Sequence, residues 1–365
     1  MKRVLLILSL CGVLYLEAEH TLAQDGYSDD SAMLWAQIYA QPEDVEVGCV
    51  PLDDPAAAFT YQSDIPFPLA SVSKLLIFIE YARRLDAGLI PQNTLVSVAT
   101  LDLYNLPRTD RGAHDRFMQQ YPEGTTQIPL WEVAVGMIRF SSNAAADYLL
   151  TVMAPIDWDT LYQVLGVTET GYPHPLTMIP LLMNNHVTGK ATLRTVDSLS
   201  VSLGESYLDL YVHDSAWRQA EIDYRSQGGS QFPEWAVQTA ILEDITVSGT
   251  ADDFLRVMTA IYGSGGALSD SVKLLVRSAL RFRGDDFIDQ HYAEYGSKLG
   301  FYSGGTLTLV AYGDPLDGGP VISALFFRAI PRSVYTDLLR EDAIGDFAHW
   351  MNFNACAGLR ESFPR

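Results

Sequence analysis

The sequence predicts an α+β fold, and three observations support this prediction. Residues 306–312 alternate in character as a strand does, and a glycine-rich turn leads from them to a second strand-like run at 321–327. Short strand-like runs also occur near the N-terminal end, within 45–62. Between residues 71 and 165, apolar residues instead recur at helical spacing. Strands gathered near both ends of a helical segment favour an α+β domain.

We expect each element from its own local pattern. Residues 27–41 read as a helix, with Met33, Leu34 and Ile38 among the candidate core contacts. The chain shows no internal repeat and no low-complexity segment. The other expected elements, in chain order, are strands at 45–51 and 58–62, a helix opened by Ser71, mixed helix and turn over 91–130, helices at 131–139, 143–153, 157–165 and 250–262 with helical structure continuing to 285, two strands within 305–328, and a helix at 333–354.

Composition indicates a globular protein with a sizeable core. The chain has 365 residues, of which 48% are apolar and 19% are charged. Its formal net charge of −21 argues against binding to nucleic acid and to an anionic membrane surface. A small local cationic site is still compatible with that balance.

The N-terminal residues resemble a secretory signal. Lys2 and Arg3 precede an apolar core that ends near Leu16, and 21–23 is a suitable cleavage site. We therefore expect a signal peptide at 1–23, a mature domain at 24–365, and a secreted or periplasmic location. The apolar run is too short and interrupted for a confident membrane span. An uncleaved anchor or lipidation at Cys11 would be alternatives.

The most informative stretch is Ser71-Val72-Ser73-Lys74, which opens a long apolar helix pattern. Spacing of three residues places the hydroxyl and the amine on one helix face. Burial of such a helix would disfavour the ammonium ion and lower the lysine pKa, so that the amine could take the serine proton. The alternative is a helix cap beside a solvated lysine.

Two further motifs carry polar groups that could serve the same chemistry. Ser141-Ser142-Asn143 links two helix-like segments, where a hydroxyl could relay a proton and a carboxamide could hold a carbonyl. Helix capping would explain this motif equally well. Lys298-Leu299-Gly300 stands at the expected opening of a strand, where the amine could bind a carboxylate and the glycine would allow a close approach. A lysine that protects a sheet edge is the alternative.

Together the three motifs resemble the S-x-x-K, S-x-N and K-[ST]-G signatures of the penicillin-recognising serine enzymes, and the chain is most similar to a class A β-lactamase domain. Residues 246–255 resemble the segment that follows the ω loop of that family, and the resemblance spans about 30–358. It implies a β-lactamase/transpeptidase-like fold, in which a five-stranded antiparallel sheet flanked by helices adjoins an all-helical half.

The resemblance also implies an acyl-serine mechanism. Ser71 would be the nucleophile, and Lys74 would accept its proton directly or through Ser141. Asn143 and Lys298 would bind the substrate, and the backbone N–H groups of Ser71 and of the residue after the third motif would form the oxyanion hole. The implied substrate-binding set is therefore Asn143, Lys298, Gly300 and Phe301. The resemblance implies a β-lactam or a peptidoglycan stem peptide as the substrate. It also implies a monomer that needs no metal or other cofactor.

Three departures from the family pattern bear on this interpretation. Ser142 stands where class A enzymes usually carry aspartate, and Leu299 replaces a hydroxyl residue that helps to bind the substrate carboxylate. The E-x-x-L-N motif, whose glutamate is the deacylation base, is absent. Glu169 is the best-placed acid for that role and His174 a weaker candidate. Without such a base, the chain could be a D-Ala-D-Ala carboxypeptidase-like penicillin-binding protein or a non-catalytic binder of cell-wall peptides.

Two further features follow from the comparison with this family. Residues 167–245 stand where the family has its ω loop but are longer than that loop requires. We interpret them as an enlarged ω region that forms a wall or lid of the site, with a packing elaboration or an oligomer contact as alternatives. Cys49 and Cys356 lie in regions that the family fold packs together, so a disulfide is reasonable. Two free buried thiols are the alternative.

Overall fold

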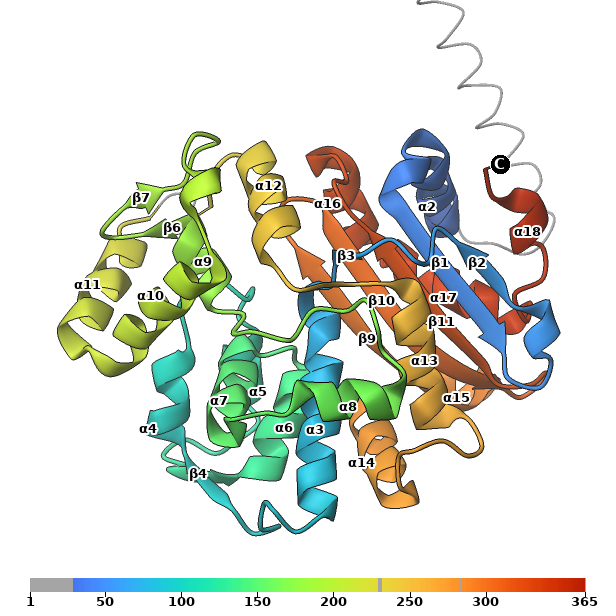
Figure 1. The fold of residues 1–365 in the computed structure, drawn as a ribbon, viewed down its shortest axis with the longest axis horizontal. Coiled ribbons are helices and arrows are strands. Elements are labelled where there is room, and N and C mark those ends of the chain that lie inside the picture. Colours follow the sequence, from blue (N-terminus) through green and yellow to red (C-terminus); the bar gives the residue numbers. More distant parts are fainter. Residues whose placement is uncertain (1–28, 229–231, 283, 365) are drawn as a thin grey trace, which may run out of the picture.

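A five-stranded antiparallel sheet forms one half of the protein (Figure 1). We describe a computed structural model that covers residues 29–228, 232–282 and 284–364; the expected signal peptide and Cys11 lie outside these residues. The strand order is β2-β1-β11-β10-β9, which confirms the predicted α+β fold. The strands are β1 (Val45–Pro51), β2 (Phe59–Tyr61), β9 (Tyr292–Tyr302), β10 (Thr306–Pro315) and β11 (Val321–Phe327).

The central strands are buried on both faces, and their alternation separates two apolar cores. On β10, Leu307, Leu309 and Ala311 belong to a core with α2 (Asp29–Ala40) and α17 (Ala343–Phe353). Val310 and Tyr312 belong to the core of the opposite face. There α13 (Ala251–Tyr262) lies across the sheet, as Figure 1 shows. Side chains of successive residues point to opposite faces, which explains the division.

The second half of the protein is helical and surrounds α3 (Lys74–Asp86). This helix is buried along its first nine residues, Lys74 to Ala82, as its all-round apolar pattern predicted. The remaining helices of this half are α4 (Val98–Leu101), α5 (Ala113–Met118), α6 (Leu130–Arg139), α7 (Asn143–Met153), α8 (Trp158–Leu165) and α14 (Asp270–Leu280).

Residues 167–245 fold into a third group of helices beside the helical half. They contain α9 (Met178–Met183), α10 (Val201–His213), α11 (Ser215–Ser226) and α12 (Trp235–Ile245), with the short strands β6 (Asn184–Asn185) and β7 (Gly189–Lys190). These helices share an apolar core with Ala144 of α7 and Tyr302 of β9. The region therefore rests against the elements that carry the second and third motifs.

Two expectations about element boundaries were wrong. Lys298 does not open a strand, because β9 begins at Tyr292 and the lysine lies in its interior. The single helix expected at 333–354 is two helices, α16 (Arg332–Arg340) and α17. Asp342 separates them in a left-handed conformation with φ of 51°, which a continuous helix cannot contain.

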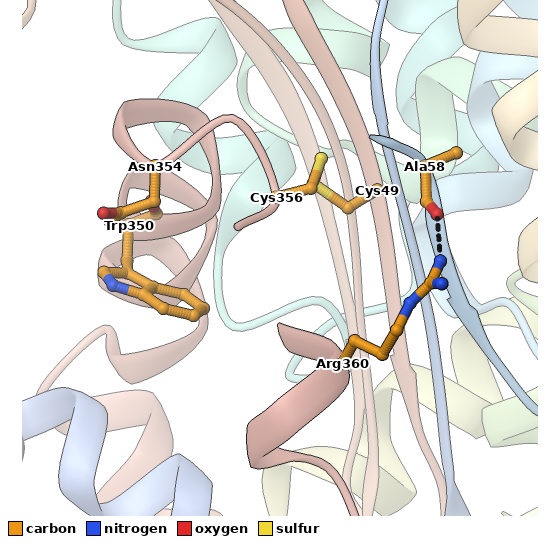
Figure 2. Close-up of a disulfide and its surroundings, with 6 residues drawn as sticks. All are labelled: Cys49, Ala58, Trp350, Asn354, Cys356 and Arg360. Carbon is orange, nitrogen blue, oxygen red and sulfur yellow. Dashed lines mark hydrogen bonds between the residues drawn. A yellow bond between two sulfur atoms is a disulfide. The ribbon is translucent and has the colours of Figure 1, made fainter. Parts of the chain in front are cut away.

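A disulfide joins the first strand of the sheet to the C-terminal segment. Cys49 lies on β1 and Cys356 follows α17, and their Cα atoms are 5.8 Å apart (Figure 2). Arg360 donates a hydrogen bond from Nη2 to the carbonyl of Ala58 at 3.3 Å, close to the same bridge. The bond connects residues 307 positions apart, so it restricts the unfolded chain over most of its length.

We expect loss of this disulfide to destabilise the fold. The double variant Cys49→Ser, Cys356→Ser should lose about 2–4 kcal/mol of unfolding free energy, because the unfolded state regains the entropy that the cross-link removes. Urea unfolding of the two proteins, with and without dithiothreitol, measures the effect. Dithiothreitol should lower the midpoint of the wild type and leave the double variant unchanged. Equal midpoints for all four samples would contradict the pairing.

Candidate active site

Ser71 lies where the chain enters its central helix. It belongs to the 3-10 turn η3 (Ala70–Ser73), which continues directly into α3. Ala70 has a left-handed φ of 47°, so the chain bends sharply just before the serine. Ser71 is partly exposed, whereas Val72 and Ser73 are buried. The turn therefore presents one hydroxyl to solvent and anchors its neighbours in the core.

Lys74 is fully buried, and its amine meets residues from two motifs. Nζ lies 3.0 Å from Ser71 Oγ and donates to Ser141 O at 2.5 Å and Asn143 Oδ1 at 2.7 Å. The two last oxygens are acceptors only, and they take two of its hydrogens. In the neutral amine, the lone pair is then left for the Ser71 hydroxyl. This geometry suits removal of the serine proton.

The Lys74 amine is buried, and its hydrogen-bond partners among the described residues include no carboxylate; burial therefore controls its charge. Burial lowers the Lys74 pKa to about 7, although the charges of Asp110 and Asp147 oppose the shift. Burial also lowers the Lys298 pKa well below its usual value, and the positive charge of Lys74 adds to this effect. A substantial fraction of Lys74 is therefore neutral near pH 7.

Ser141 bridges the two amines. Its Oγ lies 3.3 Å from Lys74 Nζ and 3.0 Å from Lys298 Nζ, and Lys298 also donates to Leu299 O at 2.7 Å. Ser141 occupies the connection between α6 and α7 with a φ of 65°, a left-handed conformation that is unusual for serine. The hydroxyl is therefore within hydrogen-bond distance of both amines.

Gly300 allows β9 to approach the nucleophile. A Cβ atom at this position would lie 2.8 Å from both Leu69 O and Ser71 N, closer than any side chain permits. Thr308 Oγ1 on the neighbouring strand donates to Leu69 O at 2.9 Å, which also holds the segment before Ser71 against the sheet. The backbone of Ser71 therefore lies directly against Gly300 of β9.

The acid expected to serve in deacylation is not joined to this site by a hydrogen bond. Glu169 is exposed, and its backbone N–H donates to Asp253 Oδ2 at 2.8 Å. Among the described hydrogen bonds, none links its carboxylate to Ser71 or Lys74. His174, the weaker candidate, bonds through Nε2 to Ile245 O at 3.1 Å.

Asp147 has a role that the sequence did not reveal. It is buried on α7 and accepts the backbone N–H groups of Leu176 at 2.7 Å and Thr177 at 2.9 Å. Burial raises its pKa to about 6, against the lowering effect of these hydrogen bonds. An acidic residue inside a buried alanine-rich helix was the available signal. The contact ties the start of the third helix group to the helix that carries Asn143.

His114 and Asp102 form a second feature that sequence reasoning missed. His114 Nδ1 lies 2.9 Å from Ser142 Oγ, and Nε2 lies 3.0 Å from Asp102 Oδ1. His114 stands at no metal-ligand spacing from the other histidines, so no sequence pattern points to it. The three residues are far apart in the chain, and only the fold brings them together. In the part of the chain that the structure describes, no group of three or more His, Cys, Asp or Glu could hold a metal ion.

Comparisons with known proteins identify the family and the fold of the chain. The sequence model of a family described as the beta-lactamase enzyme family matches residues 32–345. A β-lactamase from Sphaerobacter thermophilus superposes with a TM-score of 0.53 at 15% identity, covering 88% of this chain and 93% of that one. A class A β-lactamase from Mycobacterium abscessus gives 0.51 at 13%, covering 87% and 98%.

A third structure adds a ligand-bound relative. A mutant of PBP-A, solved as an acyl-enzyme complex with penicillin G, gives a TM-score of 0.52 at 14% identity, covering 88% of this chain and 96% of that one. At such identities these likenesses show a shared fold. A comparison with curated protein sequences finds no match.

We expect the Lys74 amine to titrate near pH 7. Burial penalises the ammonium ion and lowers the pKa to about 7, so the amine should be charged below that pH and neutral above it. NMR of the protein labelled with ε-13C lysine measures this directly, because the lysines are few: Lys2, Lys74, Lys190, Lys273 and Lys298. Substitution of Lys190 and Lys273 by arginine assigns the surface signals. A Lys74 signal that stays protonated up to pH 10 would contradict the expectation.

Proposed function

Because the chain belongs to the β-lactamase enzyme family, we propose that it is a serine hydrolase whose Ser71 is acylated by β-lactams or related cell-wall amides. The observation that carries the proposal is a single hydrogen-bonded cluster. Lys74 Nζ contacts the Ser71, Ser141 and Asn143 side chains, and Lys298 Nζ contacts Ser141. An accessible hydroxyl beside a buried amine of lowered pKa is the arrangement of an activated nucleophile.

In the proposed acylation step, neutral Lys74 takes the proton of Ser71 as Oγ attacks the substrate carbonyl carbon. The backbone N–H groups of Ser71 and Phe301 stabilise the oxyanion that develops. Loss of one such donor typically costs about 3 kcal/mol of transition-state stabilisation. The side-chain oxygen of Asn143 accepts a hydrogen bond from Lys74, and its NH₂ group is left to position the substrate amide.

Ser141 completes the step. When the tetrahedral intermediate collapses, the proton held by Lys74 passes through the Ser141 hydroxyl to the leaving nitrogen, and the carbonyl of the acyl-enzyme forms again. Lys298 donates a hydrogen bond to the Ser141 oxygen during this transfer, and its amine can also donate one to a substrate carboxylate.

Slow deacylation is the second candidate behaviour, and one observation favours it. The exposed Glu169 is tied through its backbone to Asp253, and the nearby acid Asp147 already accepts two backbone N–H groups. Neither carboxylate is hydrogen-bonded to Ser71 or Lys74. An acyl-enzyme would then persist, as in a penicillin-binding peptidase. The PBP-A mutant, which shares this fold, is described as an acyl-enzyme with penicillin G.

We also propose that the protein acts outside the cytoplasm. The basic and apolar start of the chain supports a signal peptide at 1–23. The bond between Cys49 and Cys356 fits an oxidising compartment. No helix among the described residues has the length and apolarity that a membrane crossing needs. Cell-wall peptides and β-lactams are met in the same extracytoplasmic compartment.

We expect a fluorescent penicillin to label the protein covalently through Ser71. Labelling should disappear in Ser71→Ala, and Lys74→Ala should slow it by about 10²–10⁴-fold, since the general base is lost. The labelling rate should rise as the pH passes through about 7, because the neutral amine is the active form. Gel fluorescence and mass spectrometry measure the adduct. A wild type that binds but never acquires the adduct would favour the non-catalytic binder of cell-wall peptides.

A chromogenic cephalosporin distinguishes fast from slow deacylation. We expect a burst of about one equivalent followed by slow turnover, because no carboxylate among the described residues is hydrogen-bonded to Ser71 or Lys74. Stopped-flow absorbance measures the burst and the steady rate, with Ser71→Ala as the control. Many turnovers per second without a burst would show β-lactamase behaviour instead. Glu169→Gln would then test whether that acid approaches the site in the acyl-enzyme.

A further inference from the structure

We propose that His114 is a positioning residue for the acylation site. The histidine holds the loop 141–143 against Lys74 from the side opposite the substrate. The inference rests on the proposed function for the reaction that it supports. No motif of the sequence includes this histidine, and it touches neither Ser71 nor Lys74 in the described hydrogen bonds. Its contact is with Ser142, the middle residue of the second motif.

Ser142, His114 and Asp102 form a short chain of hydrogen bonds, and its acceptors decide which atoms donate. Ser142 is fully buried, and its Oγ accepts the N–H of Ala145 at 3.1 Å as the cap of α7. The Asp102 carboxylate only accepts, so in the neutral imidazole the hydrogen is on Nε2, and Nδ1 accepts the Ser142 hydroxyl hydrogen at 2.9 Å. Nε2 donates its hydrogen to Asp102 Oδ1 at 3.0 Å. Both ring nitrogens of His114 and the Ser142 hydroxyl therefore have hydrogen-bond partners.

His114 is itself firmly held. Asp110 caps the start of its helix, α5, and accepts the backbone N–H groups of Gly112, Ala113 and His114 at 3.0–3.1 Å. The imidazole is buried and lies edge-on to the ring of Phe117. The histidine is therefore a fixed support and not a surface side chain that happens to reach the loop.

His114 acts through Ser142, the middle residue of the loop that holds Lys74. Ser142 lies between Ser141 and Asn143, and both of these neighbours accept hydrogen bonds from Lys74. Ser141 keeps its left-handed φ of 65° only while the surrounding contacts hold it. If Ser142 turned, the two acceptors would shift and the lone pair of Lys74 would no longer face Ser71. Misplacement of catalytic groups by about 1 Å can cost about 10²-fold in rate.

The arrangement does not form a second nucleophilic site, although it contains a serine, a histidine and an aspartate. Ser142 has no exposed surface, and its oxygen is occupied by the N–H of Ala145. The set instead explains one departure from the class A pattern. A short hydroxyl stands where the family usually has aspartate, and His114 supplies the additional partner that this shorter side chain reaches.

Three substitutions of His114 separate positioning from general stability. In His114→Asn the carboxamide can occupy the place of Nδ1 and still accept from Ser142. In His114→Gln the longer carboxamide can reach Asp102 but leaves Ser142 without that acceptor. His114→Ala removes both contacts. His349→Gln is the matched control, since this half-buried histidine bonds through Nδ1 to Tyr292 at 2.8 Å in the far core.

Stopped-flow labelling with a fluorescent penicillin measures the acylation rate constant and the preceding affinity separately. We expect His114→Gln and His114→Ala to lower the acylation rate constant by about 10–100-fold with the affinity nearly unchanged. His114→Asn should recover most of the rate, and His349→Gln should acylate as the wild type does. Thermal melts of all four variants show how far each is destabilised.

A second readout keeps the test independent of the proposed reaction. If the loop moves, Lys74 loses acceptors, and its ε-13C titration midpoint should shift in His114→Gln but not in His349→Gln. Wild-type acylation by His114→Ala, or equal rate losses in the Asn and Gln variants that follow their melting temperatures, would overturn the inference. An unlabelled wild type would defeat the proposed function alone, and the Lys74 titration would still decide whether His114 positions the loop.

Discussion

The amine of Lys74 lies in the interior with uncharged oxygens as its hydrogen-bond partners, and the candidate site is built around that constraint. A buried ammonium ion costs free energy unless it is paired, so the environment favours the neutral amine. Two acceptors, Ser141 O and Asn143 Oδ1, orient the group toward Ser71. The same contacts that hold the amine in the core thus direct it toward the Ser71 hydroxyl.

Two halves of the protein must meet for this arrangement to exist. The helical half contributes η3, α3 and the connection between α6 and α7, while the sheet contributes its edge strand β9. The junction depends on a small residue, because Gly300 leaves no room for a side chain against the backbone of Ser71. Lys298 then reaches Ser141 across the interface. The site is a property of the interface between the halves.

Asp147 and His114, which belong to none of the three motifs, support the elements that carry the site. Asp147 ties the start of the third helix group to α7, and His114 holds Ser142 at the opening of that helix. Both are buried polar groups whose hydrogen bonds are satisfied, an arrangement that favours one geometry over many. Ser142, which stands where the family pattern has aspartate, is hydrogen-bonded to His114.

The sequence alone determined the α+β class, the order of the motifs and the identity of the central serine and lysine, because helical and strand periodicity and short-range spacing are local properties. It could not place His114 beside Ser142, put Lys298 inside a strand, or show that Glu169 is exposed. These facts depend on contacts between residues far apart in the chain. Such contacts are decided by how the helical half packs against the sheet, and only the tertiary structure contains that packing.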